Sequence, residues 1–416
     1  MQVYKFGGAS IKDAKAVKAM AEIVIATDKP LFVVVSAMDK MTNIFETLAE
    51  AIFDSHNYEE SLNEIYTFHD TLFQNLVGKS INTSEVFTKA FNQLNQTIKV
   101  VGLSNYHALY DQIVPFGELL SSILISEYFT HLKLSHQWLN ASKIIQTNSE
   151  YRKAKVSFQK SKENLKEALS KKPIYISQGF IGGNDKGEKT TLGREGSDYS
   201  AAIFANLLDA ELITIWKDVP GVLSADPKKF KDPTLYSEIN YHEAIEMAYF
   251  GASVIHPKTI QPLQEKNIPL FVRPFENPKE IGTKISNKAV EIDLQPNIIH
   301  KNNQVLISLS AKDYEFVAES HISDIFNTLA EWNWQVNLMQ NGAVSFSICC
   351  DMQERNFEHL ISELTVNYKV RYNKNLELFT IRHYKNSVLT ELNSREILLE
   401  QKSRNTIQYL VKSTNS

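Results

Sequence analysis

The sequence TTLGREGSDYSAA at residues 190–202 decides how the rest of the chain is interpreted. In it, Ser197 and Asp198 stand just before the apolar run 201–208. Ser and Asp cap helices because their side-chain oxygens accept the unpaired amide protons of the first turn. We therefore expect a loop that enters a helix at this point, and free amides with the helix dipole favour an anion there.

The same loop carries an arginine between two glycines, Gly193 and Gly196. The guanidinium of Arg194 is a planar fork that fits a carboxylate or a phosphate. A plain glycine-rich turn before an ordinary amphipathic helix is the alternative, so other parts of the chain must decide.

A second glycine-rich turn lies near the N-terminus. A predicted strand at 3–5 runs into Gly7 and Gly8, where backbone amides can approach a phosphate with Lys5 as the counter-charge. The spacing is not that of a Walker A loop. A simple strand–turn–helix is the alternative.

Polar residues also follow other predicted strands. The apolar run 31–35 is typical of a strand buried on both faces of a parallel sheet, and Ser36 and Thr42 follow it. Ligands of open α/β sheets bind at the carboxyl ends of the strands, although Ser and Thr more commonly cap helices. A strand at 211–216 precedes a loop with Lys217 and Asp218.

Two charged residues are expected in the first turns of helices. Glu118 precedes an apolar helix at 119–129, where it would either complement the dipole or receive a substrate ammonium. Lys258 opens the helix after His256-Pro257 and opposes the dipole, which is weak evidence for a nearby anion. The segment 43–105 has helical periodicity and no catalytic pattern, so we expect a substrate lid or a dimer surface.

The pattern of elements changes near residue 295. We interpret 268–275 as the last strand before it, and 276–279 and 287–303 as an exit and a linker. A strand at 305–309, a helix at 322–332, strands at 336–339 and 344–350 and a helix at 357–364 then suggest a ferredoxin-like unit. A shortened copy follows, with strands at 369–372, 376–384, 396–400 and 406–411 and a helix at 387–392.

Composition excludes several classes of protein. The 416 residues are 43% hydrophobic and 22% charged with a net charge of −4, which gives no reason to expect a nucleic-acid or membrane partner. We find no apolar run of membrane-spanning length and no signal peptide. The only cysteines, Cys349 and Cys350, are adjacent, so a disulfide or metal pair between them is not expected. We expect a cytoplasmic protein.

Together these segments resemble the aspartate kinases of the amino-acid kinase family. The resemblance rests on KFGG at 5–8, FGE at 116–118, TLGREGSD at 191–198, DVPG at 218–221, DP at 226–227 and HPKT at 256–259. It implies an α/β domain at 1–294, with an open, mostly parallel twisted sheet sandwiched by helices. Two α+β ferredoxin-like ACT units would follow, at 295–375 and, shortened, at 376–416.

The resemblance also implies a reaction, in which MgATP phosphorylates the β-carboxylate of L-aspartate to 4-phospho-L-aspartate. This is the first step of lysine, threonine and methionine biosynthesis. The implied catalytic residues are Lys5, Asp198 and Lys258. The implied ATP-binding residues are Lys5, Gly7, Gly8, Ser36, Lys217, Asp218, Leu223, Lys228 and Lys258. The implied substrate-binding residues are Thr42, Glu118, Arg194, Gly196 and Ser197. The implied effector residues are Asn337, Gln340, Asn341 and Ser345. Mg would be bound through ATP rather than by protein side chains alone, and a homodimer or higher homo-oligomer is expected.

Some positions depart from the family pattern. Glu195 stands where the family commonly has Gly, and Ala9 where it has Thr or Ser. The effector segment 337–345 has no acidic residue, so we expect weak or no inhibition by lysine. The alternatives are a non-catalytic amino-acid-binding regulator on the same fold, and another amino-acid kinase, which would not share the Arg-x-Gly-Ser-Asp loop.

Overall fold

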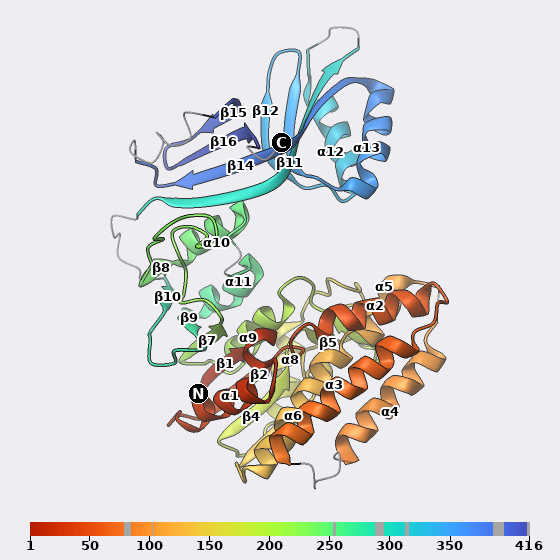
Figure 1. The fold of residues 1–416 in the computed structure, drawn as a ribbon, viewed down its shortest axis with the longest axis vertical. Helices are drawn as coiled ribbons and strands as arrows, with labels where there is room; N and C mark the ends of the chain where they lie inside the picture. Colours follow the sequence, from red (N-terminus) through yellow and green to blue (C-terminus); the bar gives the residue numbers. More distant parts are fainter. Residues whose placement is uncertain are drawn as a thin grey trace. The chain divides into compact units, whose positions relative to one another are not determined.

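The chain forms two compact units in a computed structural model (Figure 1). The structure describes residues 1–78, 85–102, 104–252, 255–287, 295–312, 316–385 and 395–413. The first unit comprises Met1–Val222, Leu235–Ala248 and Ser253–Val290, and the second comprises Leu223–Thr234, Tyr249–Ala252 and Glu291–Ser416.

An eight-stranded sheet organises the first unit, in the order β3-β4-β2-β1-β7-β9-β10-β8. Its strands are β1 (Gln2–Phe6), β2 (Leu31–Val35), β3 (His136–Leu139), β4 (Ile174–Gln178), β7 (Leu212–Lys217), β8 (Glu238–Asn240), β9 (Leu270–Pro274) and β10 (Thr283–Ser286). The strands from β3 to β9 are parallel, whereas β10 runs antiparallel to β9. A separate hairpin pairs β5 (Ile181–Gly183) with β6 (Lys189–Thr191).

Eleven α-helices belong to the segments around this sheet in the described part of the chain. They are α1 (Ala14–Ile25), α2 (Met41–Phe53), α3 (Glu59–Val77), α4 (Glu85–Val100), α5 (Tyr106–Ile113), α6 (Phe116–His131), α7 (Ala141–Ile144), α8 (Phe158–Ala168), α9 (Gly196–Leu207), α10 (Tyr241–Phe250) and α11 (Pro257–Lys266). A short 3-10 helix, η1 (Gly8–Ile11), follows β1.

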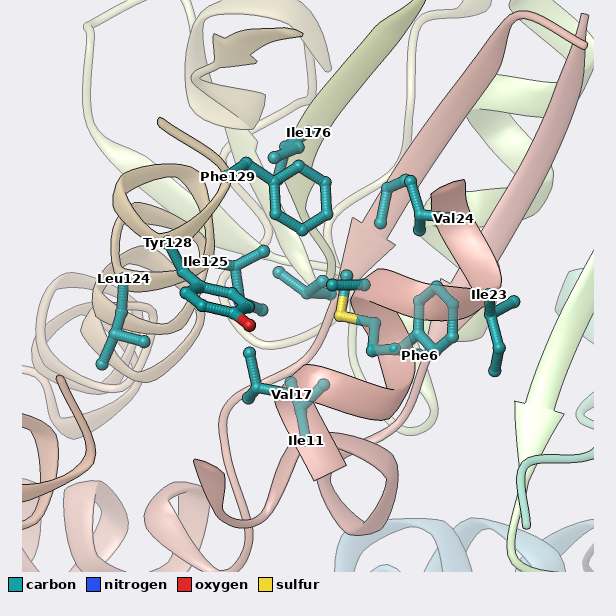
Figure 2. Packing of buried hydrophobic residues seen from close by; sticks show 14 of the residues in the cluster. Phe6, Ile11, Val17, Ile23, Val24, Leu124, Ile125, Tyr128, Phe129 and Ile176 are labelled. Carbon is teal, nitrogen blue, oxygen red and sulfur yellow. The ribbon is translucent and has the colours of Figure 1, made fainter. Parts of the chain in front are cut away.

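The alternation of side chains along the strands assigns residues to the two faces of the sheet. Tyr4 and Phe6 of β1 enter a core with α1 and α6, whose packing is visible in Figure 2. On the opposite face Phe32 of β2 packs against Phe204 of α9, with ring centroids 4.4 Å apart. Lys5 lies between Tyr4 and Phe6 in the sequence, so it shares the face of α9.

Helices α2, α3 and α4 make up most of the described part of segment 43–105, as predicted, and they share a second core with α5 and the first half of α6. The span Tyr106–His131 is long and apolar enough to cross a membrane by length and composition, contrary to our expectation that no such run exists. Within this span, 89% of an 18-residue apolar window is buried inside the protein, as in a core helix.

Three boundaries differ from the sequence-based predictions. The strand β10 follows segment 276–279, so that segment is a connection within the first unit and not an exit from it. The predicted linker 287–303 contains the start of β11 (Asn297–Ala311). Helix α9 begins at Gly196 rather than after Ser197 and Asp198, because the chain turns into the helix at Glu195.

The second unit is built on a six-stranded antiparallel sheet, in the order β12-β13-β11-β14-β16-β15. Besides β11 it contains β12 (Val336–Asn341), β13 (Phe346–Asp351), β14 (Tyr368–Arg382), β15 (Ile397–Lys402) and β16 (Thr406–Lys412), with helices α12 (Glu319–Glu331) and α13 (Glu354–Asn367). The β-α-β-β-α order that the sequence predicts is present from β11 to α13.

Both faces of this sheet are packed. Cys350 lies in a core with α12 and α13, while Cys349 lies in a second core with β15 and β16. Both cysteines are buried and free, as their adjacent positions on β13 predict. The strands predicted at 369–372 and 376–384 form one long strand, β14, and the predicted helix at 387–392 lies outside the described residues.

Candidate active site

A cavity of 590 Å³ lies in the first unit where four parallel strands end. Residues just beyond β1, β2 and β4 and the last residue of β7 contribute Gly8, Ser36, Phe180 and Lys217 to its wall. This is the edge of the sheet at which open α/β folds bind ligands.

A buried carboxylate joins two lysines at the floor of the cavity. Lys5 Nζ lies 2.6 Å from Asp198 Oδ1, and Lys217 Nζ lies 3.4 Å from Asp198 Oδ2. Burial opposes ionisation of Asp198, but the charges of Lys5 and Lys217 hold the pKa of this carboxyl below its ordinary value. Lys217 shares the face of α9 because its neighbour Trp216 stacks on Phe6 in the opposite core.

Glu118 is a buried acid of a different kind. It lies in the first turn of α6 with a side-chain oxygen, Oε2, that has no hydrogen-bond partner among the described residues. Burial raises the pKa of Glu118 from 4.5 to about 7. Hydrogen bonds from the backbone N–H groups of Ala37 and Glu118 and the charge of Lys5 lower the pKa, but burial has the larger effect. A buried carboxylate with an unpartnered oxygen is suited to bind a cation, because the cation would compensate for the hydration that the carboxylate loses on burial.

The loop at 193–197 forms another wall of the cavity. Glu195 caps α9 in a left-handed conformation with φ 53° and makes no capping side-chain bond, so Ser197 and Asp198 are first-turn residues and not the predicted caps. A Cβ atom at Gly179 would lie 2.5 Å from Cβ of Ser197, so only glycine at the end of β4 admits this loop. Arg194 is exposed and lines the cavity.

A buried aspartate fixes the approach to this loop. Asp111 accepts hydrogen bonds from the hydroxyl and backbone N–H of Thr191, at 2.7 and 2.9 Å, and from the N–H of Arg152 at 3.0 Å. Burial raises the pKa of Asp111 to about 6, and these hydrogen bonds act in the opposite direction. Asp111, which lies on α5, thereby connects this helix to the loop that precedes α8 and also to strand β6.

The structure brings most of the predicted residues of the first unit together. The cavity is lined by Lys5, Gly8, Ser36, Thr42, Glu118, Arg194, Gly196, Ser197, Asp198 and Lys217. Gly7 lies beside them, because a Cβ atom there would be 3.3 Å from Lys5 Nζ.

Other predicted residues lie elsewhere. Lys258 is exposed in the first turn of α11, as predicted, and is not among the described residues that line the cavity. The pKa of the preceding His256 is lowered by burial and influenced by the charges of Glu195, Lys258 and Arg194, so this helix start lies near the loop. Asp218 is exposed and lines a separate groove beside α1. Leu223 and Lys228 belong to the second unit.

The four predicted effector residues lie on or after β12 of the second unit. The side chain of Asn337 is bonded to Lys301 and Gln304, at 2.8 Å each. Gln340 and Asn341 are exposed, and the carbonyl of Ser345 accepts the N–H of Gly342. The amide of Asn337 is therefore engaged by neighbouring side chains of the same unit.

Sequence reasoning missed several residues of the cavity wall. They are Ala37, Asp39, Glu46, Tyr110, Arg152, Phe180, Thr191, Gly193 and Glu195. Of these, Thr191 and Gly193 had been noted only as part of the loop motif, and Glu195 only as a departure from the family pattern. Tyr110 and Arg152 come from a helix and a polar loop with no local pattern of their own. The available signal was Asp111, an acidic residue within the mainly apolar segment 108–114.

The family model described as the amino acid kinase family matches residues 1–274. The chain belongs to the amino acid kinase family. Within it, lysine-sensitive aspartokinase 3 of Escherichia coli is 32% identical over 354 residues, which cover 84% of this chain and 78% of that protein. The predicted resemblance to aspartokinases is therefore confirmed.

Solved structures of this kinase family support the same assignment. Escherichia coli aspartokinase III in complex with lysine and aspartate has a TM-score of 0.82 and 29% identity. The same enzyme with aspartate and ADP has a TM-score of 0.82 and 28% identity. Each comparison covers 99% of this chain and 96% of the other, and the predicted fold class is confirmed.

Proposed function

We propose that this chain is an aspartate kinase, which transfers the γ-phosphoryl group of ATP to the β-carboxylate of L-aspartate. The product is 4-phospho-L-aspartate, at the start of lysine, threonine and methionine synthesis. The observation that carries the proposal is the buried, unpartnered oxygen of Glu118 in a cavity that also holds arginine and two lysines. L-Aspartate has the matching ammonium group and two carboxylates.

The substrate is oriented by opposite charges at its two ends. Glu118 receives the α-ammonium, and Arg194 binds the α-carboxylate, which directs the β-carboxylate toward Lys5 and Lys217. The Thr42 hydroxyl and the Ser197 side chain lie in the same wall and complete the polar surroundings. This placement predicts a preference for an amino acid with a second, acidic group.

Phosphoryl transfer needs positioning and charge neutralisation more than acid–base chemistry. The β-carboxylate of aspartate is ionised at neutral pH, so it attacks the phosphorus without a general base. Lys5 and Lys217 lie at the carboxyl ends of β1 and β7 and neutralise the charge on the transferred group. Asp198 holds both ammonium groups in place, since it contacts each of them.

The nucleotide would lie against the glycine turn after β1. Gly8 packs so closely on the next loop that a Cβ atom would lie 2.9 Å from the carbonyl oxygens of Ala37 and Asp39. Gly7, Ser36, Asp218 and Lys258 of the first unit are proposed to contribute to the same nucleotide site. Leu223 and Lys228, which belong to the second unit, stay predicted nucleotide-binding residues. In the described part of the chain, no group of three or more His, Cys, Asp or Glu residues could hold a metal ion. Mg²⁺ bound to the nucleotide phosphates would supply further neutralisation.

A hydroxamate assay tests the proposal. Purified protein with aspartate, MgATP and hydroxylamine should form aspartyl hydroxamate, whereas glutamate, UMP or acetylglutamate should not support turnover. Absence of aspartate-dependent turnover would favour the non-catalytic regulator, and turnover with another acceptor would favour a different amino-acid kinase.

We propose that the second unit regulates the first. We divide it into ACT-like segments 295–375 and 376–416, with an amino-acid effector and a homodimer or higher homo-oligomer. Light scattering measures the oligomeric state, and activity measured with added amino acids identifies the effector.

A further inference from the structure

Three side chains outside the proposed substrate set form one wall of the cavity: Glu46, Tyr110 and Arg152. The Tyr110 hydroxyl donates a hydrogen bond to Glu46 Oε1 at 2.6 Å. The guanidinium carbon of Arg152 lies 4.2 Å from the centroid of the Tyr110 ring. A guanidinium stacked on an aromatic face is attracted to it and keeps its N–H edges available.

The backbone of Arg152 is unusual. Its φ of 65° lies in the left-handed region, which disfavours residues with a Cβ atom. Its N–H is fixed by Asp111, and its carbonyl oxygen lies 2.9 Å from the position that a Cβ atom at Gly193 would take. Residue 152 is therefore held directly beside the loop of Arg194. A strained residue that lines a cavity is a candidate for a functional role.

The charges of the cavity support such a role. Four basic residues line it, and two of them, Lys5 and Lys217, are paired with Asp198. Among the described residues, neither Arg152 nor Arg194 has an acidic group within ion-pair distance, 4 Å. The two arginines thus differ from the lysine pair, because no described acidic group holds either of them in an ion pair, although acidic residues also line the cavity.

We propose that Arg152 is a specificity-determining residue that binds the α-carboxylate of the substrate together with Arg194. The proposal rests on the proposed aspartate kinase function. Two guanidinium forks around one carboxylate select substrates that carry it, because a charge-assisted bidentate contact depends on both charge and planar geometry. Tyr110 acts as a positioning residue, since it supports the guanidinium plane and anchors Glu46.

The test compares two ligands in matched variants. Aspartate has an α-carboxylate, whereas 3-aminopropanoate keeps the ammonium and the distal carboxylate but lacks it. In Arg152→Gln, KM and the calorimetric Kd for aspartate should rise about 10- to 100-fold, with kcat at saturation changed less than about threefold. Inhibition by 3-aminopropanoate should be equal in wild type and variant. Lys153→Gln, an exposed neighbour, is the charge-matched control and should behave as wild type.

Arg152→Gly separates binding from folding. Glycine accepts the left-handed backbone, so this variant should melt at or above the wild-type temperature and still lose aspartate affinity. An aspartate Kd within twofold of wild type in both variants would overturn the proposal, as would an equal loss of 3-aminopropanoate inhibition. If the wild type binds aspartate without forming hydroxamate, the proposed function fails while the Kd comparison still decides on Arg152. No binding of aspartate to the wild type would overturn both.

Discussion

The replacement Glu118→Gln should stabilise the free protein and at the same time impair substrate binding. Burial raises the pKa of Glu118 from 4.5 to about 7. The folded state therefore binds a proton more tightly than the unfolded state, and ionisation of Glu118 costs stability. This cost appears as the pH rises above about 4.5 and is complete above about 7. At about 1.4 kcal/mol per pKa unit it reaches about 3 kcal/mol.

The glutamine variant lacks this cost. Its free energy of unfolding should exceed that of the wild type by about 3 kcal/mol above pH 8, and the difference should shrink by about 2 kcal/mol on going down to about pH 5.5. For a domain of this size the difference at high pH corresponds to a rise of about 5 °C in melting temperature. Scanning calorimetry of both proteins without substrate, across this pH range, measures it. Glu64→Gln on the exposed side of α3 is the control.

Substrate binding should change in the opposite direction. Aspartate affinity of the wild type should rise with pH until Glu118 is ionised, near pH 7, whereas the variant should bind weakly with no such dependence. Parallel melting profiles for wild type and Glu118→Gln at all pH values would refute this reasoning, because the buried charge would then not be the source of the cost.

Four other predictions follow from the site and the second unit. Arg194→Ala and Arg194→Lys should each raise the aspartate KM about 10- to 100-fold, equivalent to about 1.5–3 kcal/mol, with ATP KM unchanged; a near-normal aspartate KM removes Arg194 from the site. Lys5→Ala should chiefly lower kcat, because Lys5 acts on charge that develops during transfer; loss of ATP affinity alone would make it a ground-state anchor. Glu195→Gly should raise the free energy of unfolding by about 1 kcal/mol, since glycine relieves the left-handed conformation; an unchanged melting temperature contradicts this. Lysine should inhibit weakly compared with a neutral amino acid, because segment 337–345 has no acid; micromolar inhibition by lysine alone would disprove it.

The sequence predicted those parts of the site that depend on local patterns. Lys5 was predicted in a strand and Lys217 directly after one, and both lie near the carboxyl ends of parallel strands. The two-residue period of the strands places both on the face of α9, where Asp198 pairs with them. Glu118 and Lys258 were correctly placed in the first turns of their helices. In these cases the sequence pattern around each residue is enough to predict where the residue lies in its strand or helix.

The sequence did not predict features that depend on contacts between distant segments. Asp111 bonds to Arg152, 41 residues away, and to Thr191, 80 residues away, and neither spacing is periodic. The strand β10 is short and borders polar stretches, so its pairing with β9 decides its structure more than its composition does. Likewise β14 is continuous because it pairs with β11 on one side and β16 on the other.

The two buried acids of the cavity link stability to function in opposite ways. Asp198 has its charge compensated in the free protein by ion pairs with two lysines. Glu118 has an uncompensated oxygen and a raised pKa, and the free protein bears that cost. A substrate ammonium that pairs with Glu118 removes the cost, so part of the free energy lost in folding becomes binding free energy. A substitution such as Glu118→Gln removes the cost of the buried charge in the free protein. It also removes the group that pairs with a substrate ammonium, so the cavity should become less selective for an amino acid.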